Sequence, residues 1–304
     1  MYSLVKKFFY YCFSPRALLS VLIYKYGGWL PDKFYVAARY YLIFGRFLNL
    51  KNPKTYNQKI QWLKLYDQRA LYTELVDKVL VKKWVANLIG ENHVIPTIAT
   101  YRRAEDIDFD CLPEKFVLKC NHDSGIVLVC KNKALLDRKK VVRDFSAALN
   151  RDYFARSREW PYKNVKRRIL VECYMEDSAT KELRDYKFFC FDGVPKILFV
   201  ATDRFTKGVE TKFDFFDMNY EHLPFTNGHP NADVLPEKPM CFEQMKSFAK
   251  ILSKGFPHVR VDFYEIDGKV YFGEMTFYHW SGLVPFVPEK WDYILGEWIK
   301  LPKE

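Results

Sequence analysis

The chain has 304 residues, of which 49% are hydrophobic and 18% aromatic, enough for one large or two to three small folded cores. This composition excludes a disordered protein. Lys and Arg number 48 against 37 Asp and Glu, and the net charge of +11 predicts an anionic partner: nucleic acid, nucleotide, acidic glycan or membrane surface. Seven cysteines without a Cys-x-x-Cys pair favour a reducing compartment over a disulfide framework or zinc knuckle. We therefore expect a cytoplasmic protein.

Residues 1–50 form a basic, aromatic N-terminal segment. Lys6 and Lys7 precede apolar residues, as in a signal peptide, but Arg16 and Lys25 interrupt the run and no small-residue cleavage site follows. No stretch of about 18 uncharged apolar residues is long enough to span a bilayer. Two interpretations stay open: a helical layer packed on the main body, and an interfacial helix that makes peripheral contact with an anionic inner membrane surface.

Two helical patterns follow the boundary at Asn52-Pro53, over residues 56–66 and 72–89, and the second ends before Gly90. Asp77, Lys78 and Lys82 lie on its polar side. On spacing alone, a solvated face is the favoured interpretation of these three residues.

A strand at residues 116–120, a small polar loop at 121–125 and a returning strand at 126–129 predict a hairpin that covers phosphate. Backbone N–H groups of the loop would hold the oxygens and Lys119 would supply charge. The glycine spacing of a Walker A loop or a dinucleotide fingerprint is missing, so neither is predicted.

After a helix expected over residues 139–150 comes the basic, aromatic stretch 151–168. Stacking rings between cations suit a groove for single-stranded nucleic acid, but a solvated loop is favoured. The stretch 169–176 follows and is apolar and then acidic. The Asp192-Gly193 hairpin comes after it and begins with Asp185 and Lys187 on one strand face. A structural ion pair and a functional pair fit these two residues equally well.

The last hairpin joins residues 259–264 to 270–276 around Asp267-Gly268. Its polar face is costly to bury without partners, and it suits a divalent cation with bound phosphate. That face consists of Arg260, Asp262, Glu274 and Thr276.

The register of this hairpin decides whether one cation can join the two carboxylates. A regular two-residue turn would set Asp262 opposite Gly273 and turn Glu274 to the other face. A three-residue loop would set Asp262 opposite Phe272, with Glu274 diagonal on the same face. We therefore predict that the hairpin is bulged or has the odd loop.

The order of these motifs resembles the ATP-grasp fold and, more closely, the TupA-like ATP-grasp family of bacterial surface-polysaccharide gene clusters. The resemblance covers about residues 45–302 and rests on residues 52–59, Asp77-Lys78 with Val81-Lys82, and residues 116–119, 188–193 and 272–278. It implies an α+β fold in which two α+β subdomains clamp ATP, preceded by a mostly helical N-terminal segment. The expected divisions are 1–50, a helical region at 51–115, a subdomain with the phosphate loop at 116–170, and a subdomain with the metal site at 171–304.

The resemblance also implies roles for single residues. Lys119 and Lys187 would contact ATP phosphates and, with Asp185, the nucleotide pocket, while Ser124 and Gly125 would lie in the loop that closes over the phosphates. The linker whose backbone reads adenine would be Glu172, Cys173, Tyr174 and Met175. The magnesium ligands would be Asp262 and Glu274, with Thr276 where many ATP-grasp enzymes have Asn, and Arg260 would steady the transferred phosphoryl group.

The implied reaction is an ATP- and Mg²⁺-dependent carboxylate–amine ligation through an acylphosphate, in which cations screen the repulsion between two anions. Arg204, with Asp203, and the loop 279–282 lie where such enzymes admit their second substrate. Arg204 would pair with a uronic-acid carboxylate, and Trp280 or Tyr278 would stack on a sugar. The implied partners are an acidic glycan or a nucleotide- or lipid-linked sugar precursor, and an amino acid or other amine.

Two other classes of protein would explain some of the same features. A glycosyltransferase of polysaccharide biosynthesis would use an Asp-x-Asp motif to hold a nucleotide sugar, and Asp106-Ile107-Asp108-Phe109-Asp110 offers one, although a surface strand and turn is favoured there. A nucleic-acid-binding module would explain the charge, but the basic residues are spread along the chain and no recognition motif is present.

Overall fold

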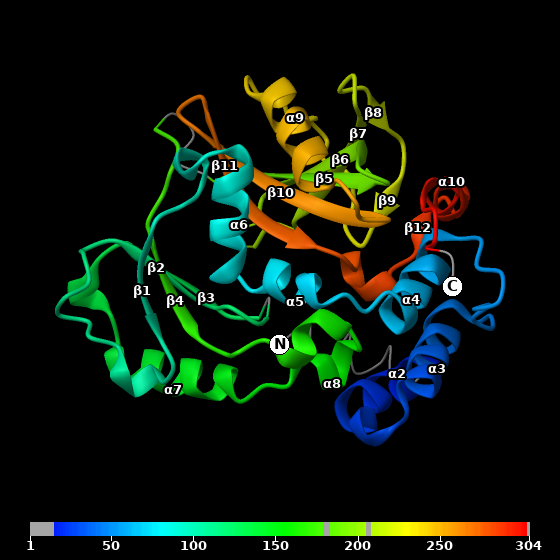
Figure 1. Cartoon of the computed structure of the whole chain (residues 1–304), viewed down its shortest axis with the longest axis horizontal. Coiled ribbons are helices and arrows are strands. Elements are labelled where there is room, and N and C mark those ends of the chain that lie inside the picture. The colour runs from blue at the N-terminus through cyan, green and yellow to red at the C-terminus, as the bar shows by residue number, and fades with distance from the viewer. Residues whose placement is uncertain (1–14, 124, 179–182, 205–207, 303–304) are drawn as a thin grey trace.

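A computed structural model of the chain describes residues 15–123, 125–178, 183–204 and 208–302. The structure has two sheets, with the short helices α5 (Ala70–Val76) and α6 (Leu80–Ile89) between them (Figure 1). Ser124 and the first 14 residues lie outside the described part. Within the described residues, no helix has the length and apolar character needed to cross a membrane.

The smaller sheet has four antiparallel strands in the order β1-β4-β2-β3. Their bounds are β1 Thr97–Tyr101, β2 Phe116–Cys120, β3 Val127–Cys130 and β4 Ile169–Cys173. Helix α7 (Arg138–Leu149) covers one face, where Phe116 and Leu118 pack with Phe145. Because strand side chains alternate, Lys119 points to the other face. The predicted division at residues 170 and 171 falls inside β4.

The larger sheet has six antiparallel strands in the order β11-β10-β5-β6-β7-β8. Their bounds are β5 Asp185–Phe191, β6 Val194–Thr202, β7 Lys212–Asp217, β8 His222–Leu223, β10 His258–Ile266 and β11 Lys269–Thr276. Helix α9 (Phe242–Leu252) lies on one face (Figure 1), with the rings of Phe242 and Phe188 5.9 Å apart. The neighbouring position Lys187 therefore lies on the face away from α9.

The remaining helices are α2 Pro15–Tyr26, α3 Asp32–Phe44, α4 Tyr56–Tyr66, α8 Tyr153–Ser157 and α10 Lys290–Trp298, and the short strands β9 Thr226–Asn227 and β12 Phe286–Val287 pair with each other. Helix α4 begins with a capping box between Thr55 and Gln58. The single helix predicted over 72–89 is wrong. The Asp77 carboxylate accepts hydrogen bonds from the N–H groups of Val79 and Leu80, which ends α5 and starts α6.

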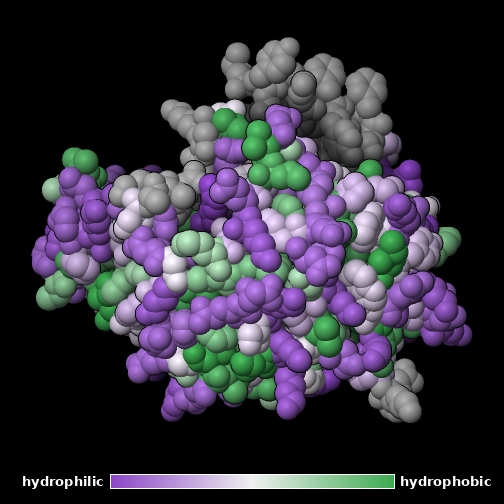
Figure 2. Space-filling view, turned by 90° about the horizontal axis from the view of Figure 1, so that it is seen from above, coloured by the Kyte–Doolittle hydropathy of each residue, from purple (hydrophilic) through white to green (hydrophobic). Residues whose placement is uncertain are grey.

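The N-terminal helices are unequally buried. Helix α3 buries Tyr35, Val36 and Tyr40, whereas the apolar Leu18 and Leu22 of α2 are exposed. The face seen from above in Figure 2 is mostly hydrophilic, with hydrophobic side chains in small groups. The packing of α3 and the exposure of α2 leave both interpretations of this segment open.

The last hairpin is bulged, as predicted, but its turn has two residues. Ile266 pairs with Lys269, and Asp267 and Gly268 both have positive φ, as a type I′ turn requires. The three-residue loop and the pairing of Asp262 with Phe272 are therefore wrong. Gly273 is the extra residue of a bulge, because Phe263 pairs with Phe272 and Asp262 with Glu274.

Candidate functional site

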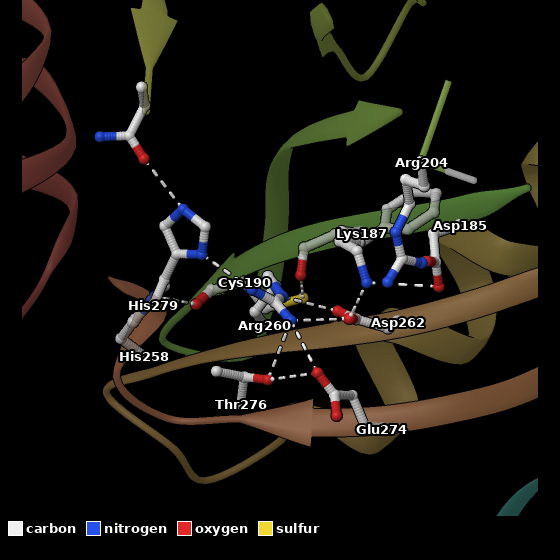
Figure 3. A network of polar contacts seen from close by, with 12 residues as sticks. Asp185, Lys187, Cys190, Arg204, His258, Arg260, Asp262, Glu274, Thr276 and His279 are labelled. Carbon is white, nitrogen blue, oxygen red and sulfur yellow. Dashed lines mark hydrogen bonds and ion pairs between the residues drawn. The ribbon is translucent and has the colours of Figure 1, made fainter. Parts of the chain in front are cut away.

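The bulge at Gly273 brings Asp262 directly opposite Glu274, and Lys187 is paired with Asp262 on the neighbouring strand. The three residues form one row across β5, β10 and β11. Arg260 lies beside this row and reaches both carboxylates (Figure 3), with Nε 2.7 Å from Asp262 Oδ1 and Nη2 2.9 Å from Glu274 Oε1. Thr276 also accepts a hydrogen bond from Arg260. The predicted polar face is thus a single network.

This network keeps the Glu274 carboxylate ionised. Burial alone would raise the pKa of Glu274, but Lys78, Arg260 and Lys187 outweigh it and lower the pKa to about 2. The described residues contain no group of three or more His, Cys, Asp or Glu side chains that could hold a metal. Magnesium commonly takes only one or two protein carboxylates together with substrate phosphates, so Asp262 and Glu274 fit that kind of site.

A buried histidine fixes the guanidinium of Arg260. His279 Nε2 lies 2.9 Å from the Asn227 side-chain oxygen and Nδ1 lies 2.8 Å from Arg260 Nη1. An oxygen can only accept, so Nε2 carries the proton and Nδ1 accepts from Arg260. Burial and the charge of Arg260 hold the pKa of His279 well below its usual range, which keeps the ring neutral. No local sequence pattern indicates this contact, because Asn227 is remote from His279 in the chain.

Lys187, which the resemblance implies to be a phosphate ligand, also forms ion pairs. Lys187 Nζ lies 2.5 Å from Asp262 Oδ2 and 3.3 Å from Asp185 Oδ1. Arg204 forms an ion pair with Asp185 (Figure 3). Asp185, Lys187 and Arg204 therefore lie together beside the Arg260 network.

On the smaller sheet, the side chain of Glu172 lies between two lysines. Its Oε2 lies 2.5 Å from Lys119 Nζ, and its Oε1 lies 2.5 Å from Lys82 Nζ. Both cations lower the pKa of this buried carboxyl against the opposing effect of burial. Glu172 and Cys173 are the last residues of β4, and Tyr174 and Met175 follow them. The role of these four residues in adenine recognition stays a prediction.

Lys78 connects the two sheets electrostatically. Its Nζ donates to the carbonyl of Asp123 at 2.6 Å. Burial lowers its pKa, and this effect is partly offset by Glu274 of the larger sheet, Asp123 of the loop after β2 and Glu172 of the smaller sheet. Lys78 and Lys82 are therefore not a solvated helical face. The helical spacing gave no sign of this, because the break at Asp77 changes the direction of the residues that follow.

The predicted phosphate loop is partly described. Gly125 N–H donates to the Asp123 carboxylate at 3.2 Å. Asn121 and His122 are buried at its base, and no hydrogen-bond partner is present in the described structure for either ring nitrogen of His122.

The two aromatic side chains expected to stack on the second substrate differ in exposure. Trp280 is 41% exposed, but Tyr278 is 3% exposed, so Tyr278 is not available to stack on a sugar. Ser281 accepts a 2.6 Å hydrogen bond from the buried Lys64. Burial lowers the pKa of Lys64 and raises that of its neighbour Glu159.

The Asp-x-Asp candidate is a local turn. The Asp108 carboxylate accepts from the backbone N–H groups of Asp110 and Cys111, and Asp110 pairs with Arg138. These contacts confirm the turn of the favoured interpretation, but the expected strand is not present among the described residues between β1 and β2.

Solved structures similar to this chain include D-alanine–D-alanine ligase from Bacillus anthracis complexed with ATP, which is 15% identical with a TM-score of 0.38 over 67% of this chain and 54% of that chain. The Helicobacter pylori enzyme of the same name is 18% identical with a TM-score of 0.43 over 82% and 70%. N5-carboxyaminoimidazole synthetase from Staphylococcus aureus complexed with ADP is 14% identical with a TM-score of 0.41 over 83% and 61%. This chain thus spans just over half of the Bacillus anthracis ligase.

No curated protein sequence matches this chain. A family model described as TupA-like ATPgrasp matches residues 58–300, which include both sheets and all of the charged contacts described above. Because the match extends over most of the chain, the protein belongs to the TupA-like ATP-grasp family and has the ATP-grasp fold.

Proposed function

We propose that the protein is an ATP- and Mg²⁺-dependent carboxylate–amine ligase of surface-polysaccharide biosynthesis. Family membership supports an ATP-grasp enzyme. The observation that carries the proposal is the gathering of Arg260, Lys187 and Lys78 around the two carboxylates of Asp262 and Glu274. Such a set of opposite charges matches a bound cation together with the negative charge of a transferring phosphoryl group.

In this proposal each charged group has a distinct task. Asp262 and Glu274 would hold the magnesium ion, which supplies Lewis-acid screening of the phosphates when bound. Arg260, oriented by His279, would stabilise charge on the transferred phosphoryl group. Lys119 and Lys78 lie beside the phosphate loop and would bind phosphate oxygens.

The proposed reaction first brings two anions together, the substrate carboxylate and ATP, and then forms an amide. A substrate carboxylate attacks the γ-phosphorus of ATP, ADP leaves, and an acylphosphate forms. An amine then attacks the acyl carbon, phosphate leaves and the ammonium loses one proton. We propose a uronic-acid carboxylate as the first substrate, with Arg204 as its candidate partner, and an amino acid or other amine as the second. We expect the reaction in the cytoplasm.

Hydroxylamine trapping tests this reaction class. The protein is incubated with ATP, Mg²⁺ and uronic acids, and hydroxamate and ADP are measured. We expect both products to depend on the acid, and Arg260→Gln to abolish both. A parallel incubation contains nucleotide sugars. Consumption of a nucleotide sugar there, without ADP formation in the first incubation, would contradict the proposal and favour a glycosyltransferase.

The exposed apolar residues of α2 support peripheral contact with an anionic membrane as part of the proposal. Cosedimentation with anionic liposomes should occur at low salt and weaken as salt rises. Absence of binding at low salt would favour the packed-layer interpretation.

A further inference from the structure

A cavity of about 450 Å³ opens next to the phosphate loop and is lined by Arg102, Lys166, Arg167 and Arg168. Among the described residues, no carboxylate lines it. The residues come from two places in the sequence: Arg102 follows β1, and the other three precede β4. The paired strands β1 and β4 bring them to the same end of the sheet, because Tyr101 lies opposite Ile169.

Most of this charge has no counter-ion. Arg167 lies 3.9 Å from Asp152 and donates to the carbonyl of Leu149. The side chains of Arg102, Lys166 and Arg168 have no ion pair or hydrogen bond with any described residue. A concave site with charges of one sign concentrates ions of the opposite sign. The cavity therefore attracts anions more strongly than scattered surface lysines would.

The wall of the cavity is anchored to the phosphate loop. Asn121, which is fully buried at the start of that loop, donates through Nδ2 to the carbonyl of Lys166 at 3.0 Å. Its side-chain oxygen accepts from Arg168 N–H at 2.7 Å, and its own N–H donates to the carbonyl of Arg168 at 3.0 Å. The N–H of Lys78 lies 3.4 Å from the carbonyl of Asn121. One residue thus joins the cavity, the loop and a lysine of the nucleotide site.

We propose that this cavity binds a multiply charged oxyanion of the acidic substrate, either a diphosphate or neighbouring carboxylates, next to the site of phosphoryl transfer. The role of substrate rests on the ligase function proposed above, whereas the binding of an oxyanion rests on the cavity alone. The fixed position of Arg168 relative to the loop would set the distance between the bound oxyanion and the reacting carboxylate. The site thus selects substrates that carry a second anionic group.

Titration calorimetry with two probes tests the proposal. Uridine diphosphate represents a diphosphate and trigalacturonate represents neighbouring carboxylates. Each is titrated into the full chain at low ionic strength with Mg²⁺ and a saturating non-hydrolysable ATP analogue, so that neither probe enters the nucleotide site. We expect at least one probe to bind, and Arg102→Gln/Arg168→Gln to weaken it about tenfold or more without changing affinity for the ATP analogue.

The matched control is Lys139→Gln/Lys250→Gln, which removes the same charge at exposed positions outside the cavity and should weaken binding less than about twofold. If Arg168→Gln does not fold, Arg102→Gln/Lys166→Gln tests the same cavity at two exposed positions. Absence of binding by both probes, equal loss in the control, or tighter binding of a single-stranded oligonucleotide would overturn the proposal. Probe binding that depends on Arg102 without any acid-dependent ADP release would support the oxyanion site and refute the ligase function.

Discussion

Arg260 Nη1 donates a 2.8 Å hydrogen bond to Nδ1 of His279, so a catalytic candidate is oriented by a ring that must stay neutral. A second proton on that ring would remove the acceptor and place two cations in contact. Burial prevents this. The direction of the guanidinium is therefore set by His279 as well as by the carboxylates of Asp262 and Glu274.

The variant His279→Phe tests this orientation. Phenylalanine keeps a ring between Phe189 and Phe199, whose centroids lie 4.8 and 5.5 Å from that of His279, but it accepts no hydrogen bond. We expect turnover of ATP to fall roughly tenfold while affinity for ATP stays unchanged. Equal turnover in variant and parent would show that Asp262 alone orients Arg260.

The pair of lysines around Glu172 predicts non-additive stability. Lys119→Met or Lys82→Met alone leaves the buried carboxylate one partner, whereas the double variant leaves it none, which costs about 3–5 kcal/mol. Urea unfolding of the four proteins should show a double loss well above the sum of the single losses. Lys119→Met alone should also abolish ATP binding. Additive losses would mean that Glu172 does not depend on these lysines.

Two buried histidines predict acid sensitivity. Burial lowers the pKa of His258 to about 3 and that of His279 well below 6.5. The unfolded chain therefore binds more protons below about pH 6.5, so stability is full above that value and falls as the pH drops toward the folded pKa. The expected slope is about 1.4 kcal/mol per pH unit for each histidine.

His258→Gln should remove about half of this slope in urea unfolding between about pH 7 and pH 5. Glutamine can replace both contacts of the ring, which lies 2.9 Å from the hydroxyl of Tyr56 and 2.9 Å from the carbonyl of Cys190. Parallel curves for parent and variant would contradict the assignment.

The bulge predicts a sensitive glycine. A Cβ atom at Gly273 would lie 3.1 Å from the Asp262 carbonyl oxygen and 3.2 Å from the ring of Tyr264. Gly273→Ala should therefore cost about 1–3 kcal/mol and weaken the effect of Mg²⁺ on ATP binding. Gly28→Ala is the control, because its Cβ would meet nothing closer than 3.8 Å. An unchanged melting temperature for Gly273→Ala would show that the bulge adjusts.

The order of the motifs was sufficient to predict the fold, through its resemblance to the ATP-grasp family. The polar face of the last hairpin predicted a bulge or an odd loop, because a regular two-residue turn would separate the two carboxylates. It did not predict the position of the bulge at Gly273, since a turn sequence does not determine where the extra residue lies. The helical spacing favoured a solvated face for Lys78 and Lys82. That interpretation is wrong because the Asp77 side chain breaks the helical period on which it rested. The contacts of His279 and Asn121 join distant segments, and no local pattern contains them. The roles of the site residues stay predictions.

The spacing of the contacts around Asp262 also has a consequence for how the site assembles during folding. The contact between Arg260 and Glu274 spans 14 residues, whereas that between Lys187 and Asp262 spans 75. Closing a short loop costs less chain entropy than closing a long one. We therefore expect the carboxylate–arginine hairpin to form early, with Lys187 arriving later, so that an incompletely folded chain already presents the proposed cation site before the proposed nucleotide contact of Lys187 forms.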